Sequence, residues 1–164
     1  MSVTRCHVGL GGNIGGAQQT LRQAIALLAD ISGTQLVRAS SLWRTAPQGH
    51  AAQPDFINAV AALDTGLTPR ALLDALLALE LRFGRERSFA NAPRTLDLDL
   101  LLHGDTVIAE PGLELPHPRM HERAFVLAPL LELDPDCTIP GRGRAADCLA
   151  RISGQAVEKL EGSA

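Results

Sequence analysis

Apolar residues are grouped in four stretches with the spacing of β-strands. Residues 5–10, 34–43, 56–65 and 93–102 carry apolar side chains in alternation or in short continuous runs. Runs of this length and pattern are typical of strands that contribute to a folded core. The stretch 93–102 (PRTLDLDLLL) is the most unusual of the four, because an otherwise apolar run contains two aspartates.

Helices are predicted between and after these strands. Residues 17–29 place apolar side chains about three or four positions apart, which is the period of one helix face. A second helix is expected to begin after Thr68, a capping residue that proline follows at the first helical position, and to end at Gly84. Residues 116–133 should begin as a loop and continue as one or two short helices. Residues 143–160 should contain one or two weak helices.

The predicted order is β-α-β-β-α-β followed by helices. This mixture favours an α+β fold with an antiparallel sheet covered by helices, and the order fits the ferredoxin-like arrangement. No internal repeat or linker divides the 164 residues, so a single domain is expected. The loop 44–55 is long for a hairpin connection, which indicates a functional role.

The two aspartates of the fourth strand predict a cation site. Asp97 and Asp99 are two positions apart, so their side chains share one face of a strand. Four leucines are expected on the opposite face: Leu96, Leu98, Leu100 and Leu102. Adjacent carboxylates repel each other, and a divalent cation such as Mg²⁺ removes that repulsion by binding both. The alternatives are two solvated acids on an exposed edge strand and acids paired with arginine.

Composition narrows the class of protein. The chain is 46% hydrophobic, enough for a core, yet it has no apolar run long enough to predict a membrane span. The net charge of −3 argues against a general affinity for nucleic acid, so neither a membrane nor a nucleic acid is expected as a partner. The three cysteines lack metal-site spacing and no secretory signal is recognised, which together predict a cytoplasmic protein with reduced thiols.

Positive charge is almost entirely arginine, with fourteen arginines and a single lysine. Six of the arginines lie close together in the sequence: Arg82, Arg85, Arg87, Arg94, Arg119 and Arg123. The planar guanidinium group presents a fork of donors that suits phosphate oxygens. The alternative is ordinary solvated charge on loops.

Two motifs leave their roles open. Residues 9–16 (GLGGNIGG) follow a strand and precede a helix, as phosphate-binding loops do, but they lack both the G-x-G-x-x-G spacing and the Walker lysine. A tight turn is the alternative. His117 and His121 are four positions apart, but the glutamate and further ligands of a zinc site are missing. A histidine beside arginines is better interpreted as a phosphate donor.

Aromatic residues are few, and two of them could bind a flat ligand. Phe56 and Phe125 are among only four phenylalanines in a chain without tyrosine. They belong either to the core or to a clamp on the two faces of a ring. Asn58 shares a strand face with Phe56, and its amide offers the donor and acceptor that suit the edge of a heterocycle.

These motifs occur together in the order found in a known family. The segment PRTLDLDLLLHG resembles the signature of 6-hydroxymethyl-7,8-dihydropterin pyrophosphokinase of folate biosynthesis. The resemblance covers about residues 5–140, with 141–164 as a peripheral tail of the same domain, and includes in order GLGGNIG, SSLWRTAPQG, QPDFINAV, LELRFGRER and LPHPRMHERAFVLAPLLEL. It implies a monomer with a ferredoxin-like fold that transfers pyrophosphate from ATP to the hydroxymethyl oxygen of the pterin, with release of AMP.

The resemblance also implies the residues of the site. Asp97 and Asp99 would hold two Mg²⁺ ions that bridge the ATP phosphates, and Asp97 is the better candidate to accept the proton of the alcohol. The implied catalytic residues are Asp97, Asp99, Arg85 and Arg94. The implied pterin site consists of Thr45, Gln48, Phe56, Asn58 and Phe125. The implied ATP site consists of Glu80, Arg87, Arg94, Leu100, His117 and Arg123.

The chain departs from the family pattern at several positions. Gly12 stands where serine is frequent, Phe56 where tyrosine is common, and Asn91 where some members carry tryptophan. Residues 84–93 are expected to close over the bound ligands, with Phe89 as a possible substitute for the missing aromatic. Another Mg²⁺-dependent phosphotransfer or phosphodiester enzyme is the main alternative. An RNA-binding ferredoxin-like domain is disfavoured by the acids expected on the sheet and by an aromatic content of 3%.

Overall fold

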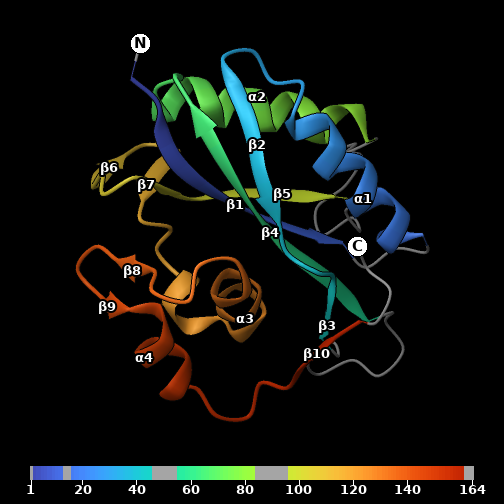
Figure 1. Cartoon of the computed structure of the whole chain (residues 1–164), viewed down its shortest axis with the longest axis vertical. Helices are drawn as coiled ribbons and strands as arrows, with labels where there is room; N and C mark the ends of the chain where they lie inside the picture. The colour runs from blue at the N-terminus through green and yellow to red at the C-terminus, as the bar shows by residue number, and fades with distance from the viewer. Residues whose placement is uncertain (1, 13–15, 46–54, 84–95, 161–164) are drawn as a thin grey trace.

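The centre of the protein is a six-stranded antiparallel sheet in the order β10-β3-β4-β1-β5, in which β2 also pairs with β4. This computed structural model describes residues 2–12, 16–45, 55–83 and 96–160 (Figure 1). The three long strands are β1 (Thr4–Gly12), β4 (Phe56–Thr65) and β5 (Asp97–His103). The shorter strands are β2 (Thr34–Ala39), β3 (Trp43–Thr45) and β10 (Val157–Lys159).

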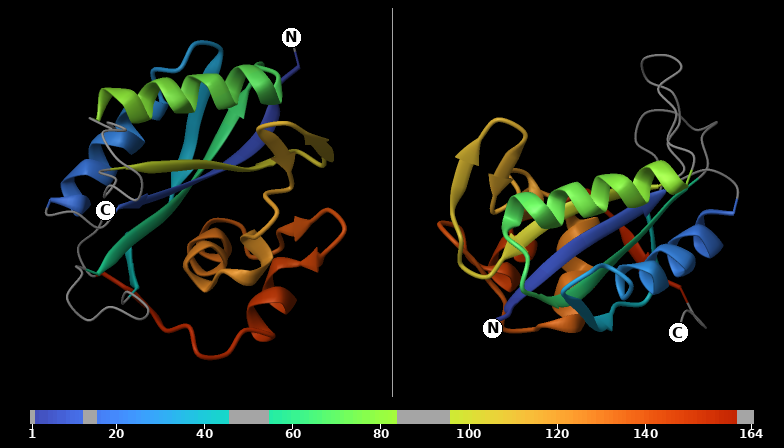
Figure 2. Two further views of the ribbon diagram at one scale, coloured as in Figure 1. Left: turned by 180° about the vertical axis from the view of Figure 1, so that it is seen from behind. Right: turned by 90° about the horizontal axis from the view of Figure 1, so that it is seen from above.

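Helices cover both faces of this sheet, as Figures 1 and 2 show. On one face, α1 (Ala17–Leu28) and α2 (Pro69–Arg82) pack against the apolar side chains of β1, β4 and β5. On the other face lie α3 (Ala124–Leu133) and α4 (Ala145–Ala150), around a second apolar cluster. The strands are ordered β5-β1-β4-β2/β3 across the sheet, with α1 after β1 and α2 after β4 along the chain. This arrangement confirms the predicted α+β ferredoxin-like class.

The first two helices form where the apolar period and the caps predict them. In α1 the buried residues recur every three or four positions: Ala17, Leu21, Ala24 and Leu28. The α2 helix begins as expected, because the Thr68 side chain accepts a hydrogen bond from the Ala71 N–H at 3.2 Å and Pro69 occupies the first helical position. It ends at Arg82, whereas the expected stop at Gly84 lies outside the described residues.

The predicted strand 34–43 is wrong as one continuous element. It divides into β2 and β3, and both pair with β4. Ser40 lies at the break, where its N–H donates to the Val60 carbonyl and its hydroxyl accepts from the Val60 N–H. A side chain that replaces a backbone partner interrupts the ladder of backbone hydrogen bonds. After this break, β3 pairs with β4 in a different register from β2.

Strand β5 contains a bulge that the apolar pattern did not predict. His7 of β1 pairs with Leu102 and Val8 pairs with Leu100, so Leu101 is an extra residue. Leu98 and Leu100 pack beneath α1 and α2 as expected, but Leu102 packs with Leu101 in the cluster around α3. The prediction that Leu102 shares a face with the other leucines is therefore wrong, because a bulge breaks the two-residue alternation.

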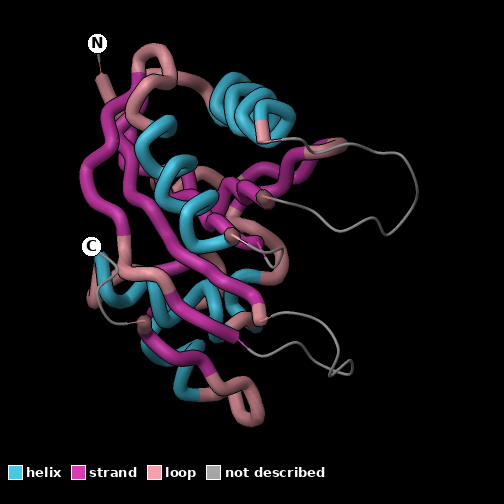
Figure 3. The backbone as a smooth tube through the Cα atoms, turned by 90° about the vertical axis from the view of Figure 1, so that its right-hand side faces the viewer, coloured by secondary structure: helices cyan, strands magenta, loops and turns pink. Residues whose placement is uncertain are grey.

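The second half of the chain adds short elements around this sheet. A hairpin of β6 (Ile108–Glu110) and β7 (Leu113–Leu115) precedes the short helix η1 (Met120–Glu122), and a second hairpin joins β8 (Thr138–Ile139) to β9 (Gly143–Arg144). The helices expected within 116–133 and near residue 145 are confirmed. One helix, α4, forms within 143–160, where one or two were expected, and residues 157–159 form the strand β10 on the edge of β3 (Figure 3).

Two structural observations concern the predictions made from composition, one on the cysteines and one on membrane spans. Cys6, Cys137 and Cys148 are free and buried, and burial raises the pKa of the Cys6 thiol to about 12, which makes it unreactive. Within the described part of the chain, no helix is long and apolar enough to cross a membrane.

Candidate active site

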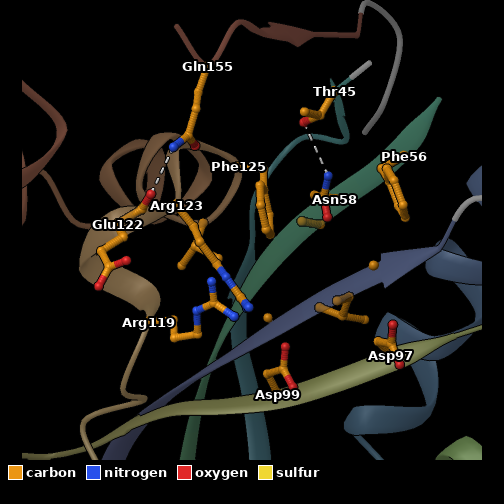
Figure 4. A pocket seen from close by; sticks show the side chains of 15 residues that line it. Thr45, Phe56, Asn58, Asp97, Asp99, Arg119, Glu122, Arg123, Phe125 and Gln155 are labelled. Carbon is orange, nitrogen blue, oxygen red and sulfur yellow. Dashed lines mark hydrogen bonds between the residues drawn. The ribbon is translucent and has the colours of Figure 1, made fainter. Parts of the chain in front are cut away.

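A cavity of about 610 Å³ lies between the sheet and the start of α3. Strands β1, β3, β4 and β5 supply its floor, and the segment that joins η1 to α3 supplies one wall (Figure 4). With Gln155, residues from six separate regions of the chain meet in it, and acidic, basic, amide and aromatic side chains all line it.

The floor is built from two rows of directly paired residues. Asn58, Gly11 and Asp97 are paired across β4, β1 and β5, and Val60, Gly9 and Asp99 form the next row on the same face. Directly paired residues of antiparallel strands project to the same side of a sheet. Because glycine has no side chain, neither row has a side chain of its own at the middle position, although the Leu101 side chain lies beside Gly9. The floor thus leaves open space between the amide of Asn58 and the two carboxylates.

The two aspartates lie on β5, as predicted, and both line the cavity. Between them, the backbone N–H of Leu98 donates a hydrogen bond to Glu80 Oε2 at 2.6 Å, from the opposite side of the sheet. Glu80 is only 2% exposed, so this contact holds the strand where the two acids project. Glu80 does not line the cavity, and its assignment to the nucleotide stays a prediction.

An amide and two aromatic rings form the other end of the cavity. Asn58 is buried, and its Nδ2 donates to Thr45 Oγ1 at 3.4 Å, which orients the amide. In Figure 4, Phe56 and Phe125 lie on either side of Asn58. Phe56 is 38% exposed, so part of its side chain is open to contact with a ligand. An amide between two rings provides hydrogen bonds at the edge of a flat ligand and apolar contact on its faces.

Two arginines face the carboxylates across the cavity. Arg119 and Arg123 both line it, and the Arg123 guanidinium carbon lies 5.5 Å from the centre of the Phe125 ring. In Figure 4 both guanidinium groups point toward the side of the cavity that contains Asp99. This arrangement provides donors for an anion next to the acidic pair.

His117 lies beside this group, although it does not line the cavity. Its ring Nδ1 accepts a hydrogen bond from the backbone N–H of Arg119 at 3.2 Å. The backbone N–H of His117 donates to the Leu101 carbonyl. Burial lowers the pKa of His117, the charge of Asp99 raises it, and the charge of Arg123 lowers it again. His117 is therefore neutral near pH 7 and has its proton on Nε2, which can donate to a phosphate oxygen.

The structure brings together seven of the predicted site residues in this cavity: Thr45, Phe56, Asn58, Asp97, Asp99, Arg123 and Phe125. Leu100 is packed beneath α1 and α2 and does not line the cavity, so its contact with adenine stays a prediction. The remaining predicted residues lie outside the described part of the chain: Gln48, Arg85, Arg87 and Arg94.

Sequence reasoning did not assign five residues that line the cavity to the site. Gly9 and Gly11 had been noted only as part of a candidate phosphate-binding loop and Arg119 only as one of six arginines suited to phosphate, whereas Glu122 and Gln155 were missed altogether. The alternation of Gly9 and Gly11 in an apolar strand was an available signal, because interior glycines of a strand often mark close approach of another group. The position of Gln155 had no such signal, since it depends on the path of the chain after α4.

The donor set of the cavity fits Mg²⁺ better than zinc. Asp97 and Asp99 offer hard carboxylate oxygens on one face of a strand, and Mg²⁺ usually takes one or two carboxylates and completes its coordination with water and substrate phosphates. Among the residues that the structure describes, no group of three or more His, Cys, Asp or Glu side chains could enclose a metal ion. The neighbouring arginines could bind the same phosphates.

Solved structures share the fold of this chain. A crystal structure of HPPK-DHPS in complex with substrates superposes with a TM-score of 0.73 at 10% identity, covering 92% of this chain and 43% of that chain. An HPPK-DHPS structure from Plasmodium falciparum has a TM-score of 0.73 at 11% identity, covering 92% and 45% of the two chains. The chain spans less than half of either structure, and at these identities the likeness concerns the fold alone.

Sequence comparison identifies the family. A Pseudomonas aeruginosa protein named 2-amino-4-hydroxy-6-hydroxymethyldihydropteridine pyrophosphokinase is 42% identical over 161 residues, covering 98% of this chain and 99% of the relative. A protein of the same name from Synechocystis sp. is 46% identical over 143 residues, covering 85% and 73%. The family model described as 7,8-dihydro-6-hydroxymethylpterin-pyrophosphokinase (HPPK) matches residues 7–135. The chain belongs to the 7,8-dihydro-6-hydroxymethylpterin-pyrophosphokinase family.

Proposed function

We propose that this protein transfers pyrophosphate from ATP to the hydroxymethyl group of 6-hydroxymethyl-7,8-dihydropterin, with AMP and the pterin diphosphate as products. The observation that carries the proposal is the row Asn58–Gly11–Asp97, which sets an amide and a carboxylate at the two ends of a bare floor. A heterocycle bound at the amide would extend its hydroxymethyl group toward the acids. The names of the relatives support the type of reaction. The row of paired residues supports the positions of the pterin and the phosphates.

At the pterin end, the Asn58 amide pairs with the polar edge of the heterocycle and Thr45 holds the amide in place. Phe56 and Phe125 stack on the two faces of the ring. Gln48 completes the pterin site, as the family resemblance implies. The partly exposed ring of Phe56 supports this assignment, because a ligand would cover apolar surface that otherwise faces water.

At the phosphate end, Asp97 and Asp99 hold two Mg²⁺ ions together with ATP, while Arg119, Arg123 and His117 bind phosphate oxygens. The chemistry that bound Mg²⁺ supplies is neutralisation of phosphate charge around the reacting phosphorus. Further donors come from three arginines outside the described residues, Arg85, Arg87 and Arg94. The protein acts as a monomer. These groups position and neutralise the phosphates, which is most of what phosphoryl-type transfer requires of a protein.

In the reaction, the pterin alcohol oxygen forms a bond to the β-phosphorus of ATP. The bond from that phosphorus to the α–β bridging oxygen breaks, and AMP leaves with the bridging oxygen. Asp97 accepts the proton of the alcohol, because it shares the row of Asn58 whereas Asp99 lies one row farther along β5.

Substitution of the acidic pair tests the proposal. Asp97→Ala and Asp99→Ala should each lower turnover by at least about 10³-fold, the scale of lost transition-state charge stabilisation, while circular dichroism shows an intact fold. Asp105→Ala is a matched control, because Asp105 is an exposed aspartate that does not line the cavity. AMP formation is followed at saturating Mg²⁺ with and without pterin. Near wild-type activity in either variant contradicts the metal assignment.

The pterin dependence separates this function from the main alternative. A phosphodiesterase or nuclease that uses the same acids would release nucleotide without pterin, whereas the proposed enzyme requires it. Asn58→Ala should weaken pterin binding by about 1–3 kcal/mol, since the polar edge of the bound ring loses its partner, and should barely change ATP binding. Equal losses for both ligands would argue against a pterin site at Asn58.

A further inference from the structure

The side chain of Gln155 spans the joint between η1 and α3. It lies in the segment between α4 and β10 and lines the cavity. Its Oε1 accepts a hydrogen bond from the Ala124 N–H at 3.0 Å. Its Nε2 donates to the Glu122 carbonyl at 3.0 Å, the bond drawn in Figure 4. One amide thus contacts the backbone on both sides of Arg123.

This amide replaces a cap that the helix does not supply itself. The first N–H groups of a helix have no partner within it, and a side chain at the cap position usually accepts one of them. At α3 the cap residue is Arg123, which makes no such bond, and Gln155 accepts from the first helical residue instead. The cap therefore comes from a residue that is distant in sequence and belongs to the cavity wall.

The joint that Gln155 holds determines where two proposed ligand contacts project. Arg123 has φ −118° and ψ 107°, so the chain turns there between one helix and the next. Phe125 follows within the first turn of α3, and the Arg123 guanidinium lies over its ring. A rotation of the backbone at this joint would move the guanidinium and the ring together, because both side chains leave from it.

The same segment also reaches the opposite wall of the cavity. After Gln155 the chain forms β10, where Val157 pairs with Thr45, and the Leu160 N–H donates to the Leu42 carbonyl at 2.9 Å. Residues 151–160, here called the C-terminal strap, thus connect the α3 wall to the strand that carries Thr45. The strap lies next to both ends of the proposed site.

We propose that Gln155 is a positioning residue for the transfer reaction, which aligns Arg123 with the phosphates and Phe125 with the pterin by holding the η1–α3 joint. The inference rests on the proposed function. Gln155→Ala removes both hydrogen bonds, and Gln155→Glu keeps an acceptor for Ala124 but sets a carboxylate oxygen against the Glu122 carbonyl. Each variant should lower kcat/KM for the pterin by about tenfold, the scale of one or two lost hydrogen bonds.

A matched control separates positioning from a loss of stability. Thr68→Ala also removes the side-chain cap of a helix N-terminus, at α2, and Thr68 does not line the cavity. It should lower the Tm by an amount similar to Gln155→Ala but leave the kinetic constants for pterin and ATP unchanged. Steady-state kinetics of all variants are measured well below their Tm, so that each enzyme is folded during the assay.

A double-mutant cycle tests whether the effect passes through Arg123. If Gln155 acts by placing that guanidinium, Gln155→Ala should lower kcat/KM much less in an Arg123→Ala background than in the wild type. Fully additive losses, or kinetic constants of Gln155→Ala that match those of Thr68→Ala, would overturn the inference. The wild-type enzyme tests the proposed function separately, since absence of pterin-dependent AMP formation there would refute the function itself.

Discussion

The bare floor of the cavity can be tested by adding a single methyl group. In Gly11→Ala the new Cβ would lie 3.0 Å from Asn58 Oδ1, closer than nine in ten real Cβ contacts. Gly11 lies in β1 and has no positive φ, so the backbone accepts alanine without strain, and the contact with Asn58 is the main consequence. Among the described residues, the side-chain hydrogen bond that holds the amide is the 3.4 Å contact with Thr45, and a side chain held in this way can move more easily than the backbone of the sheet.

The expected result is a loss of pterin affinity with little loss of stability. Displacement of the Asn58 amide by a few tenths of an ångström breaks its alignment with the heterocycle, and the methyl group also raises the floor on which the ring would lie. An unpaired polar edge costs about 1–3 kcal/mol, which corresponds to a loss of about 5- to 150-fold in affinity. Isothermal titration with pterin, in the presence of a non-hydrolysable ATP analogue and Mg²⁺, measures the effect.

The neighbouring row provides the comparison. A Cβ at Gly9 would meet the Leu101 side chain at 3.5 Å, an ordinary contact, and no atom of Asn58 is among its nearest neighbours. Gly9→Ala is therefore expected to weaken pterin binding less than Gly11→Ala does. If Gly11→Ala binds pterin as tightly as the wild type, or if Gly9→Ala loses more, then the open space beside Asn58 is not what admits the ligand.

Three further predictions concern stability, each measured by urea denaturation. Burial lowers the pKa of His7 from 6.5, so below that pH the unfolded state binds more protons than the folded state. The free energy of unfolding should therefore fall as the pH drops through and below 6.5. In His7→Gln it should fall less steeply. An equal slope in the variant would contradict this. The Glu132 carboxylate accepts hydrogen bonds from the Ser41 N–H, the Ser41 hydroxyl and Trp43 Nε1, so Glu132→Ala should cost about 2–3 kcal/mol, and a loss below about 0.5 kcal/mol would show that water replaces these bonds. Thr68→Ala should cost about 1 kcal/mol through the lost cap of α2, with unchanged stability as the refuting result.

Local patterns were sufficient to predict most of the regular elements and part of the site. The period of apolar residues in α1 and the cap at Thr68 depend only on neighbours along the chain, and the structure has both helices where they were expected. The two-residue alternation of a strand likewise predicted that Asp97 and Asp99 share a face, and both line the cavity. Residue type and strand spacing singled out Asn58, Phe56 and Phe125 as candidates for a flat ligand, the family resemblance assigned them to the pterin, and the fold brings them together with the acids.

Features that depend on pairing between distant segments could not be predicted in the same way. The bulge at Leu101 moves Leu102 to the other core cluster. The bulge belongs to the pairing of β1 with β5, whose register shifts between His7 and Val8. Edge pairing with β3 makes a strand of residues 157–159, within a tail where only helices were expected.

The sequence by itself determined which side chains are candidates for the chemistry, because residue type and local spacing set charge, hydrogen-bonding capacity and the face on which a side chain projects. Only the tertiary structure decided that Gly11 leaves the space between Asn58 and Asp97, and that Gln155 caps α3 from the C-terminal strap. The physical reason is that strand register and the path of a connecting segment follow from packing over the whole core. Residues far apart in the sequence share that packing, and no local period records it.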